Sequence, residues 1–417
     1  MLNTEQQKAF DIMAQGNNIF LTGNAGTGKS YLLKTFIELA EKAKKKVLIT
    51  APTGIAAINI GGSTVHRAFK IPLNPAGPDT KIKIPSVVEE ADIIIIDEIS
   101  MVRADIFYYI SRIIKKAQEL AHKKIQLIVV GDFFQLPPVM TNNDRNLLKQ
   151  IWNYDFEEGY AFATKTWQNY NFQNIILTTN VRQKDATFIS ILNAIRQGNY
   201  YGIKNLENLA TKEWQKDAIY LCSTNQEASE FNEQKLAEIN KPEKTFEAKI
   251  KGKVNKGDKP VDDIITLKVN ARVMTVINSP DNSYQNGSMG YITKISGKKI
   301  TIQFDNGNTK TIEPYTWNVI EYNVSSKGLE KNIIGTFTQL PLKLGYAITI
   351  HKAQGQTFEN VNINPRCFCE GQLYVGLSRC TSLEGLHLNS PYINPRWLQT
   401  SKKVIDFYKQ LETRKEN

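Results

Sequence analysis

The sequence predicts an α/β protein with two parallel-sheet domains and a small antiparallel β-barrel inserted into the second. Short, continuously apolar runs alternate with helical stretches in both halves of the chain, a pattern typical of parallel sheets covered by helices on both faces. Between about residues 246 and 337 the pattern changes to short alternating strands and turns, which favours a small barrel. A chain of 417 residues, of which 41% are hydrophobic, is long enough for this organisation.

The first domain is predicted from four apolar strands and the helices between them. The strands are expected in "NIFLTG", "KKVLITA", "ADIIIIDE" and "KIQLIVVGD", with helices from Lys29, from about Gly54 and in "ADIFYYISRIIKKAQELAHK". A segment dense in Pro, Gly and Lys at about 70–88 interrupts this alternation, and we expect an inserted loop or small hairpin there. Ligands are expected at the carboxyl ends of the strands, where such sheets bind them.

The α/β pattern resumes after the first domain, beginning at "NIILTTNVRQ". A helix is expected in "ATFISILNAIRQG", a strand in "AIYLCSTN" and a helix in "QEASEFNEQKLAEI". After the barrel segment the pattern returns at "GYAITIHKAQG" and "LYVGLSRC", and the chain ends in a charged helix.

Charge and cysteine content restrict the class of protein. Lys and Arg number 52 against 41 for Asp and Glu, giving a net charge of +11, which favours a polyanionic partner such as nucleic acid, although many basic proteins bind none. The four cysteines lack the paired spacing of a zinc site, which favours reduced cytosolic thiols. No signal peptide or membrane span is recognised, so we expect a soluble, intracellular protein without a membrane partner.

A phosphate loop is predicted in "GNAGTGKS", which fits G-x-x-x-x-G-K-[ST] directly after a strand and at the start of a helix. Glycines let successive backbone N–H groups point at the phosphates, and the helix N-terminus adds positive potential. Lys29 is expected to reach the β- and γ-phosphates and Ser30 to bind Mg²⁺. A chance glycine-rich turn is the alternative. The predicted nucleotide-binding residues are Gly23, Asn24, Ala25, Gly26, Thr27, Gly28, Lys29, Ser30 and Tyr31.

Two buried strands each end in a carboxylate. The run Ile93 to Ile96 leads into Asp97 and Glu98, and "LIVVGD" ends at Asp132. In an adjacent pair the first carboxylate can hold Mg²⁺ while the second polarises a water. We therefore assign Asp97 to the metal and Glu98 as general base, and leave Asp132 as a structural carboxylate; a surface acidic pair is the alternative.

Two arginines in the second half are candidates for stabilising charge on the γ-phosphate. Arg182 in "NVRQKD" and Arg379 in "VGLSRC" both follow strand-like or helical runs. Cations supplied by a second domain stabilise the charge that develops during phosphoryl transfer. Taken singly, an arginine in such a position is more often a surface residue.

With these residues assigned, the chain resembles the superfamily 1B helicases of the Pif type. The resemblance rests on ordered segments that include "LNTEQQKAF", "TGNAGTGKS", "ITAPTGIAAINIGGSTVHRAF", "IIIDEISMV", "VVGDFFQLPPV", "NVRQKDATFISILNAIRQG", "LPLKLGYAITIHKAQGQTFENV" and "GQLYVGLSRCTSLEGL". It runs from about residue 2 to residue 390. It implies two RecA-like domains, at 1–178 and at 179–245 with 338–417, a short wedge insertion at about 70–88, and an SH3-like insertion at 246–337.

The resemblance also implies an activity and residue roles. It implies an ATP- and Mg²⁺-dependent, monomeric 5′-to-3′ DNA helicase that moves on single-stranded DNA and unwinds forked or structured DNA, in DNA repair, recombination or telomere maintenance. Its location would be cytoplasmic and nucleoid-associated, with nucleus and mitochondrion left open. Gln6 would contact adenine, Gln135 would sense the γ-phosphate, Arg182 and Arg379 would be arginine fingers, and Gly355 and Gln356 would line the nucleotide cleft. The implied DNA-binding residues are Pro52, Thr53, Gly54, Thr64, His66, Phe69, Thr349, His351 and Lys352.

The residues themselves support the DNA contacts more weakly. Hydroxyls, backbone N–H groups and a lysine suit phosphates, and His66, Phe69 and His351 could stack on bases. A lone histidine in an apolar stretch such as "STVHRAF" is by itself more often a core or surface residue, and only the match to the ordered segments favours a DNA contact. Gln135 continues into Leu-Pro-Pro, and because proline limits backbone freedom we expect this segment to relay the state of the γ-phosphate toward the DNA.

Other functions remain as alternatives. A nucleic-acid-stimulated ATPase that strips proteins or acts on RNA without separating strands would need only the motor. A P-loop kinase or switch NTPase is disfavoured by the Asp97–Glu98 pair, by the two arginines and by the absence of N-K-x-D. A basic binding module with a vestigial site is disfavoured because Lys29, Ser30, Asp97 and Glu98 are all present.

Overall fold

The structure is a computed structural model and describes residues 2–71, 77–153, 159–209, 213–281, 283–325, 328–388, 390 and 392–413. The chain forms two compact units. Unit 1 comprises Met1–Val181, Val319–Ile334 and Asp406–Asn417, and unit 2 comprises Arg182–Asn318 and Gly335–Ile405. Within the described residues, no helix is both long and apolar enough to cross a membrane.

Unit 1 is built on a six-stranded parallel sheet with the order β3-β2-β4-β5-β1-β6. The core strands are continuously buried, as expected for strands covered on both faces. Its strands are β1 (Ile19–Gly23), β2 (Val47–Ala51), β3 (Ser63–Thr64), β4 (Ile93–Ile96), β5 (Gln126–Val130) and β6 (Gln173–Leu177). Because all six run parallel, their carboxyl ends lie on one edge of the sheet.

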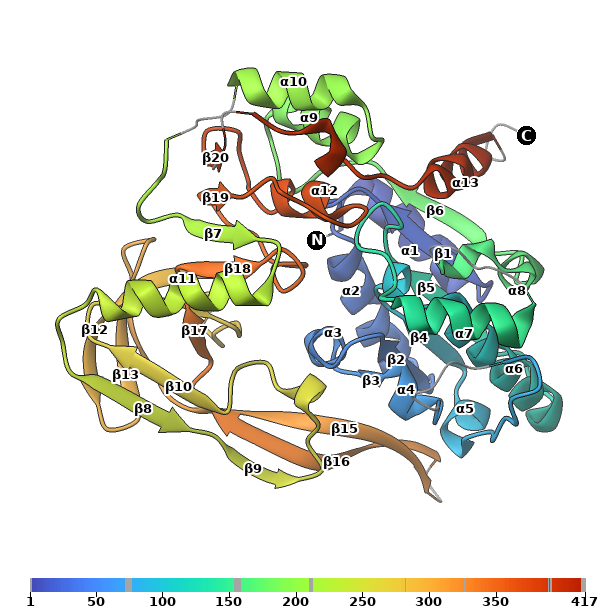
Figure 1. The fold of residues 1–417 in the computed structure, drawn as a ribbon. Helices are drawn as coiled ribbons and strands as arrows, with labels where there is room; N and C mark the ends of the chain where they lie inside the picture. Colours follow the sequence, from blue (N-terminus) through green and yellow to red (C-terminus); the bar gives the residue numbers. More distant parts are fainter. Residues whose placement is uncertain are drawn as a thin grey trace. The chain divides into compact units, whose positions relative to one another are not determined.

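Helices lie on both sides of this sheet (Figure 1), and successive strand residues point to its opposite faces. One face packs on α1 and α2 through residues such as Ile19, Ile95 and Ile128. On β1, Phe20 packs instead against the rings of Trp167 and Phe133. The helices of unit 1 are α1 (Thr4–Ala14), α2 (Lys29–Lys42), α3 (Gly54–Ile60), α4 (Val65–Ala68), α5 (Ser86–Glu90), η1 (Ile99–Met101), α6 (Ala104–Ala121), α7 (Asn142–Trp152), η2 (Ala161–Ala163) and α8 (Lys165–Asn169).

Unit 2 contains a second parallel sheet and an antiparallel part. The parallel sheet has four short strands in the order β18-β7-β19-β20. These strands are β7 (Ile219–Cys222), β18 (Ala347–Thr349), β19 (Val361–Ile363) and β20 (Leu386–Leu388), and the accompanying helices are α9 (Ala186–Arg196), α10 (Tyr200–Leu209), α11 (Asn225–Ala237), α12 (Gln372–Leu377) and η4 (Pro395–Trp397).

Three antiparallel sheets occupy the segment between β7 and β18. They have the orders β10-β8, β14-β13-β12-β11-β17 and β15-β16-β9. Their elements are β8 (Glu243–Glu247), β9 (Lys249–Gly252), η3 (Lys256–Asp258), β10 (Ile264–Lys268), β11 (Arg272–Thr275), β12 (Met289–Ser296), β13 (Lys299–Phe304), β14 (Thr309–Ile312), β15 (Tyr315–Ser325), β16 (Gly328–Gln339) and β17 (Leu342–Leu344).

Two parts of the chain differ from the sequence-based expectation. The pattern of strands and helices alone placed "NIILTTN" at the start of the second α/β region, whereas the family resemblance placed residues up to 178 in the first domain. The structure agrees with the second placement here, because β6 pairs with β1 and completes the first sheet. The C-terminal helix α13 (Lys402–Thr413) belongs to unit 1 from Asp406 onwards. Pattern alone indicates a strand or helix but carries no information on which distant strand it joins.

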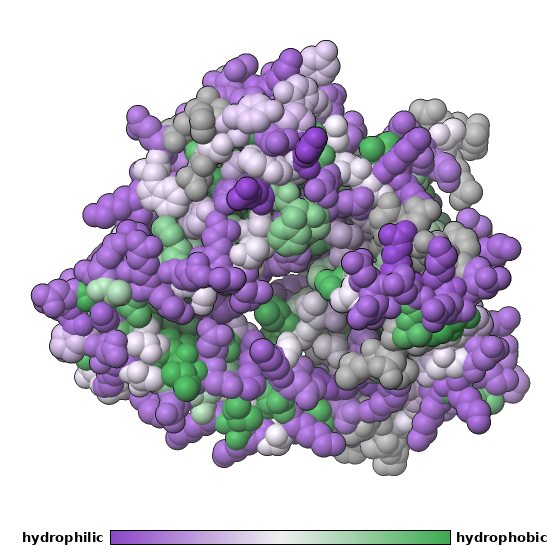
Figure 2. Space-filling model, viewed as in Figure 1, coloured by the Kyte–Doolittle hydropathy of each residue, from purple (hydrophilic) through white to green (hydrophobic). Residues whose placement is uncertain are grey.

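The expected wedge at about 70–88 is only partly described, because residues 72–76 lie outside the described chain. Residues 77–85 contain no strand and lead into α5. Pro78 and Thr80 carbonyls accept hydrogen bonds from Arg112 of α6, at 2.8 and 3.0 Å. This described part is therefore a loop held on α6. On the face drawn in Figure 2, apolar residues form small groups separated by hydrophilic side chains.

Candidate active site

The phosphate loop joins the end of β1 to α2, as the sequence predicts. Gly23, Gly26 and Gly28 all have positive φ, and at Gly28 (φ 80°) an added Cβ would collide with Gln6 Nε2. At Gly23 an added Cβ would collide with the Leu177 carbonyl. Only glycine therefore fits these two positions without displacing a neighbour. Asn24 and Gly26 are half-buried, Ala25 and Thr27 are buried, and Tyr31 is 51% exposed.

Gln6 holds the phosphate loop from outside. Its Oε1 accepts a hydrogen bond from Asn3 N at 3.1 Å, as part of the capping box of α1, and its Nε2 donates to Thr27 O at 3.2 Å. Gln6 is 4% exposed. The predicted adenine contact is thus a neighbour of the phosphate loop.

The segment after β6 also supports the phosphate loop, a contact that the sequence did not lead us to expect. After β6, Val181 N donates to Gly26 O at 2.8 Å, and Asn180 Nδ2 donates to Ala25 O at 3.3 Å. Thr178 and Thr179, just before them, donate to the carboxylate of Glu5. The sequence could have indicated this contact, because these residues directly follow a predicted strand, and loops at the carboxyl ends of parallel strands commonly lie at the ligand site.

Lys29 lies across the loop, where its Nζ donates to Gly23 O at 2.7 Å and Asn24 O at 3.0 Å. Burial raises the pKa of Asp97 to about 6. The hydrogen bond from Glu98 N–H and the positive charges of Lys29 and Lys34 act in the opposite direction and lower this pKa. The lysine and the acidic residue therefore lie within electrostatic range of each other, as nucleotide chemistry requires.

Glu98 has an unusual backbone conformation, with φ 51° and ψ 46° in the left-handed region. Its N–H donates to Asp97 Oδ1 at 2.9 Å, and its carbonyl accepts from Met101 N at 3.1 Å. Left-handed backbone costs a non-glycine residue about 1–2 kcal/mol, and such strain is concentrated at functional sites. The predicted general base is therefore held in a fixed, strained turn.

The oxygen donors here fit Mg²⁺. Ser30 offers an exposed hydroxyl at the start of α2, and Asp97 offers a half-buried carboxylate. In the parts of the chain that the structure describes, three or more His, Cys, Asp or Glu side chains gather nowhere at metal-binding distance. Mg²⁺ commonly takes one or two protein oxygens together with phosphates and waters, so the pair suits a metal that arrives with the nucleotide.

The segment after β5 forms a tight turn next to the acidic pair. Gly131 N donates to Leu21 O at 3.1 Å, and a Cβ on Gly131 would come within 3.0 Å of Ile99 N. Asp132 is fully buried and accepts from Phe134 N at 3.1 Å through its carboxylate. Gln135 N donates to Asp132 O at 2.9 Å. The prediction that Asp132 is structural agrees with this placement.

The two predicted arginine fingers lie together in unit 2, at the end of α12. Arg182 Nη1 donates to Ser378 O at 3.0 Å, and Arg379 Nη2 donates to Ser378 Oγ at 2.9 Å. Arg379 also donates from Nε to Val375 O at 2.9 Å and is 2% exposed. Burial lowers the pKa of the Arg182 guanidinium.

The predicted cleft residues of unit 2 adjoin this arginine pair. Arg379 Nη1 donates to Gln356 O at 3.3 Å, and Gly355 before it has φ 81°. Within the described chain, Gln356 Oε1 is buried with no hydrogen-bond partner. A buried acceptor without a partner is costly, which is consistent with a ligand group meeting it.

The DNA-binding candidates of unit 1 follow β2 and β3. Thr53 caps α3 by accepting from Ala56 N, and Thr64 caps α4 by accepting from Arg67 N. Pro52 is half-buried and Gly54 is buried as the first residue of α3. A hydroxyl that accepts in this way still has a proton to donate, which suits a phosphate contact.

The aromatic candidates of unit 1 differ from each other. His66 is half-buried, and burial, followed by the charge of Arg103, lowers its pKa. Phe69 is 0% exposed. Base stacking by Phe69 is therefore wrong for this structure, because a ring with no accessible face has no room for a base; Phe69 belongs to the core.

The DNA-binding candidates of unit 2 follow β18. Thr349 is buried and accepts from Lys352 N at 3.3 Å, so its hydroxyl stabilises the turn that carries the next residues. His351 is half-buried, and burial lowers its pKa. Lys352 is exposed. Within this group Lys352 is the residue best placed for a phosphate.

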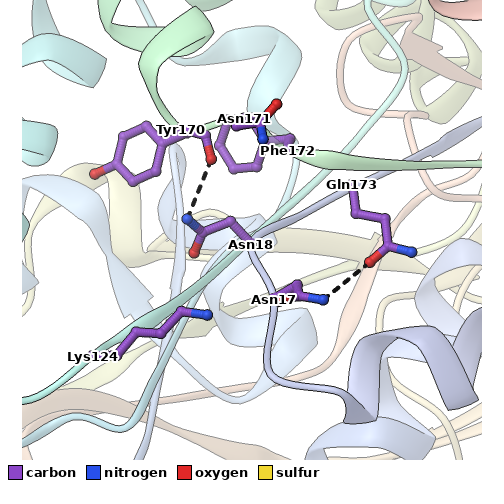
Figure 3. Close-up of a pocket in the computed structure, with 7 residues that line it drawn as sticks. All are labelled: Asn17, Asn18, Lys124, Tyr170, Asn171, Phe172 and Gln173. Carbon is purple, nitrogen blue, oxygen red and sulfur yellow. Dashed lines mark hydrogen bonds between the residues drawn. The ribbon is translucent and has the colours of Figure 1, made fainter. Parts of the chain in front are cut away.

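A separate polar pocket lies at the other end of the first sheet (Figure 3). Asn18 precedes β1 and Gln173 begins β6, so the pocket adjoins the amino ends of these strands. It is lined by Asn17, Asn18, Lys124, Tyr170, Asn171, Phe172 and Gln173. It contains none of the predicted site residues.

Comparison with known proteins places this geometry in a family. Residues 1–205 match the family model described as PIF1-like helicase. The ATP-dependent DNA helicase Pif1 of Campylobacter jejuni is 33% identical over 94% of this chain and 95% of its own length. The chain belongs to the PIF1-like helicase family.

Solved structures of this family agree with the fold of the present PIF1-like helicase. Bacteroides sp Pif1 in complex with ADP-AlF4 matches with a TM-score of 0.88 and 34% identity, over 99% of this chain and 98% of that one. Bacteroides Pif1 bound to ssDNA matches with a TM-score of 0.69 and 35% identity, over 99% and 98%. The expected α/β fold with a RecA-like parallel-sheet core and additional antiparallel sheets is confirmed.

Proposed function

We propose that this PIF1-like helicase uses ATP to move 5′ to 3′ along single-stranded DNA and to unwind forked or structured DNA. The observation that carries the proposal lies in unit 1. The phosphate loop, the Asp97–Glu98 pair and the Gln135 turn follow β1, β4 and β5, three neighbouring strands of one parallel sheet. Nucleotide ligands and a hydrolytic base thus share one edge.

In the proposed hydrolysis, the phosphate-loop N–H groups and Lys29 bind the β- and γ-phosphates. Glu98 accepts a proton from the attacking water, which its fixed turn orients. Ser30 and Asp97 would hold Mg²⁺, which when bound would neutralise charge on the phosphates. Arg182 and Arg379 stabilise the charge that develops on the γ-phosphate, and the proposal therefore requires unit 2 to approach the nucleotide during the cycle.

For DNA, we propose contacts from both units. Thr53 and Thr64 offer capped helix N-termini, and Lys352 offers an exposed ammonium. His66 and His351 remain candidates for stacking. The proposed domains are residues 1–178 and 179–245 with 338–417, with insertions at about 70–88 and 246–337, and the proposed working form is a monomer.

The test combines ATP hydrolysis with unwinding. We expect single-stranded DNA to stimulate ATP hydrolysis, and a duplex with a 5′ single-stranded tail to be unwound. A duplex with only a 3′ tail should remain intact, and unwinding of that substrate alone would reverse the assigned polarity. Sedimentation of the protein with and without a tailed duplex would test the monomer.

A second candidate function is ATP-driven translocation that displaces bound proteins or acts on RNA without separating strands. It is favoured by the described part of the wedge region, residues 77–85, which forms a loop without a strand. Gel assays with matched DNA and RNA duplexes, and with a protein-blocked single strand, distinguish the two. Stripping of the blocking protein without duplex unwinding would favour this second function.

A further inference from the structure

Tyr408, on the C-terminal helix α13, reaches the nucleotide edge of unit 1. Its hydroxyl lies 2.5 Å from Thr22 Oγ1, the last residue before the phosphate loop. It donates to Asp132 Oδ1 at 3.2 Å and accepts from Phe133 N at 3.2 Å. Tyr408 and Thr22 are 5% and 0% exposed. One hydroxyl therefore joins the ends of β1 and β5.

These three contacts match the capacity of a phenol group. A tyrosine hydroxyl has one proton to donate and two lone pairs to accept with. The proton goes to the Asp132 carboxylate and Phe133 N–H uses one lone pair. In the contact with the Thr22 hydroxyl either oxygen can be the donor, and the second lone pair of Tyr408 is able to accept. Because burial excludes water, the loss of this group would leave polar atoms without a substitute partner.

The same contacts bear directly on the Gln135 turn. The Asp132 carboxylate that accepts from Tyr408 also accepts from Phe134 N, and the Asp132 carbonyl accepts from Gln135 N at 2.9 Å. The ring of Tyr408 packs on Phe134, with centroids 4.8 Å apart. Both the hydroxyl and the ring of Tyr408 therefore define where Gln135 is held.

The helix that carries Tyr408 is anchored independently. The neighbouring Phe407 ring stacks on Phe162 at 4.3 Å and contacts Phe133 edge-on at 5.7 Å. This aromatic packing orients α13 and does not depend on the Tyr408 hydroxyl. Replacing the hydroxyl therefore tests positioning of the turn separately from attachment of the helix.

We propose that Tyr408 is a positioning residue for ATP hydrolysis, which holds the Asp132–Gln135 turn in register with the strand end that enters the phosphate loop. It acts through Gln135 and not on the nucleotide itself. The inference rests on the proposed function, because Gln135 must be the γ-phosphate sensor.

The experiment measures single-strand-stimulated ATP hydrolysis of the full chain bearing Tyr408→Phe, which keeps the ring and removes the hydroxyl. We expect kcat to fall about tenfold with KM for ATP changed less than about twofold, since a displaced group costs transition-state binding more than ground-state binding. In a Gln135→Ala background the same substitution should have no further effect on kcat.

Tyr346→Phe is the matched control, because the Tyr346 hydroxyl accepts from Arg272 N in unit 2, away from the phosphate loop. It should lower Tm without lowering kcat. An unchanged kcat in Tyr408→Phe, or an equal fall in kcat with and without Gln135, would overturn the proposal. If Tyr408→Phe does not fold, Thr22→Val is judged by the same two criteria. An inactive wild-type protein would instead contradict the proposed function.

Discussion

The parallel sheets of the two units differ in the chemistry of the loops that adjoin their strands. In unit 1, β1 leads into a glycine-rich loop and Lys29, whose ammonium is held by two backbone carbonyls. In unit 2, no phosphate loop follows a strand among the described residues, and Arg182 and Arg379 lie at the end of α12, next to the segment that precedes β19. One sheet is built to bind phosphate, and the other holds buried cations on backbone carbonyls.

The difference shows how a parallel sheet can carry either a phosphate loop or arginine side chains. Glycines with positive φ make the unit 1 loop a cradle of N–H groups, which only an anion satisfies. In unit 2 burial lowers the pKa of both Arg182 and Lys343. These cations are therefore held at a free-energy cost, and an anion arriving from outside unit 2 would relieve it.

The largest effect is expected from Arg379→Ala, which removes a cation from unit 2. We expect kcat for ATP hydrolysis to fall about 10³-fold with little change in ATP binding, because arginine fingers act on the transition state. Steady-state ATPase and nucleotide-binding titrations measure the two quantities. Arg366→Ala, an exposed arginine of the same unit, is the control and should keep wild-type kcat. An equal fall in kcat for Arg379→Ala and Arg366→Ala would contradict a specific role of Arg379 in hydrolysis.

Lys29→Ala addresses unit 1 and should reduce kcat/KM for ATP by about 10²-fold or more, since the ammonium neutralises charge on the phosphates. Lys42→Ala in the last turn of the same helix is the control. DNA-stimulated hydrolysis that survives Lys29→Ala would contradict the nucleotide site.

A smaller effect is expected for DNA binding by unit 2. Lys352→Ala should weaken single-stranded DNA binding severalfold and reduce the slope of log K against log salt by about 1, as for one phosphate contact. Fluorescence anisotropy at several salt concentrations measures both. Lys298→Ala in the exposed β12–β13 turn should leave the slope unchanged. A slope that Lys352→Ala does not alter would exclude this contact.

The smallest effect concerns the cost of holding a cation in unit 2. Burial, and then the charge of Lys352, lowers the pKa of Lys343 from 10.5 to about 8. Below pH 8 both folded and unfolded states are protonated and the penalty is complete; as pH rises from 8 to 10.5 the folded state loses its proton first, so stability increases. Because Lys343 is half-buried, solvent screening reduces the penalty.

We therefore expect Lys343→Met to be more stable than wild type at pH 7.5, on the order of 1 kcal/mol, with a smaller advantage at pH 9.5. Urea unfolding of both proteins at the two pH values measures the difference. An advantage that is the same at both pH values would contradict the lowered pKa.

The sequence by itself determined the local chemistry. The phosphate loop, the acidic pair after β4 and the Gln135 segment are each contiguous, and strand and helix patterns place them at the carboxyl ends of strands. Glycine at residues 23 and 28 belongs to the phosphate-loop motif, whereas the neighbours that exclude a side chain there, Leu177 and Gln6, are known only from the structure.

Only the tertiary structure decided which distant segments meet. β6 joins the first sheet, and Asn180 and Val181 hold the phosphate loop. Tyr408 joins Thr22 to Asp132 across 386 and 276 residues of sequence. Phe69 was assigned to DNA from its motif, and burial places it in the core. The physical reason is that apolar periodicity specifies which face of an element is buried but not its partner, which depends on packing among all elements at once.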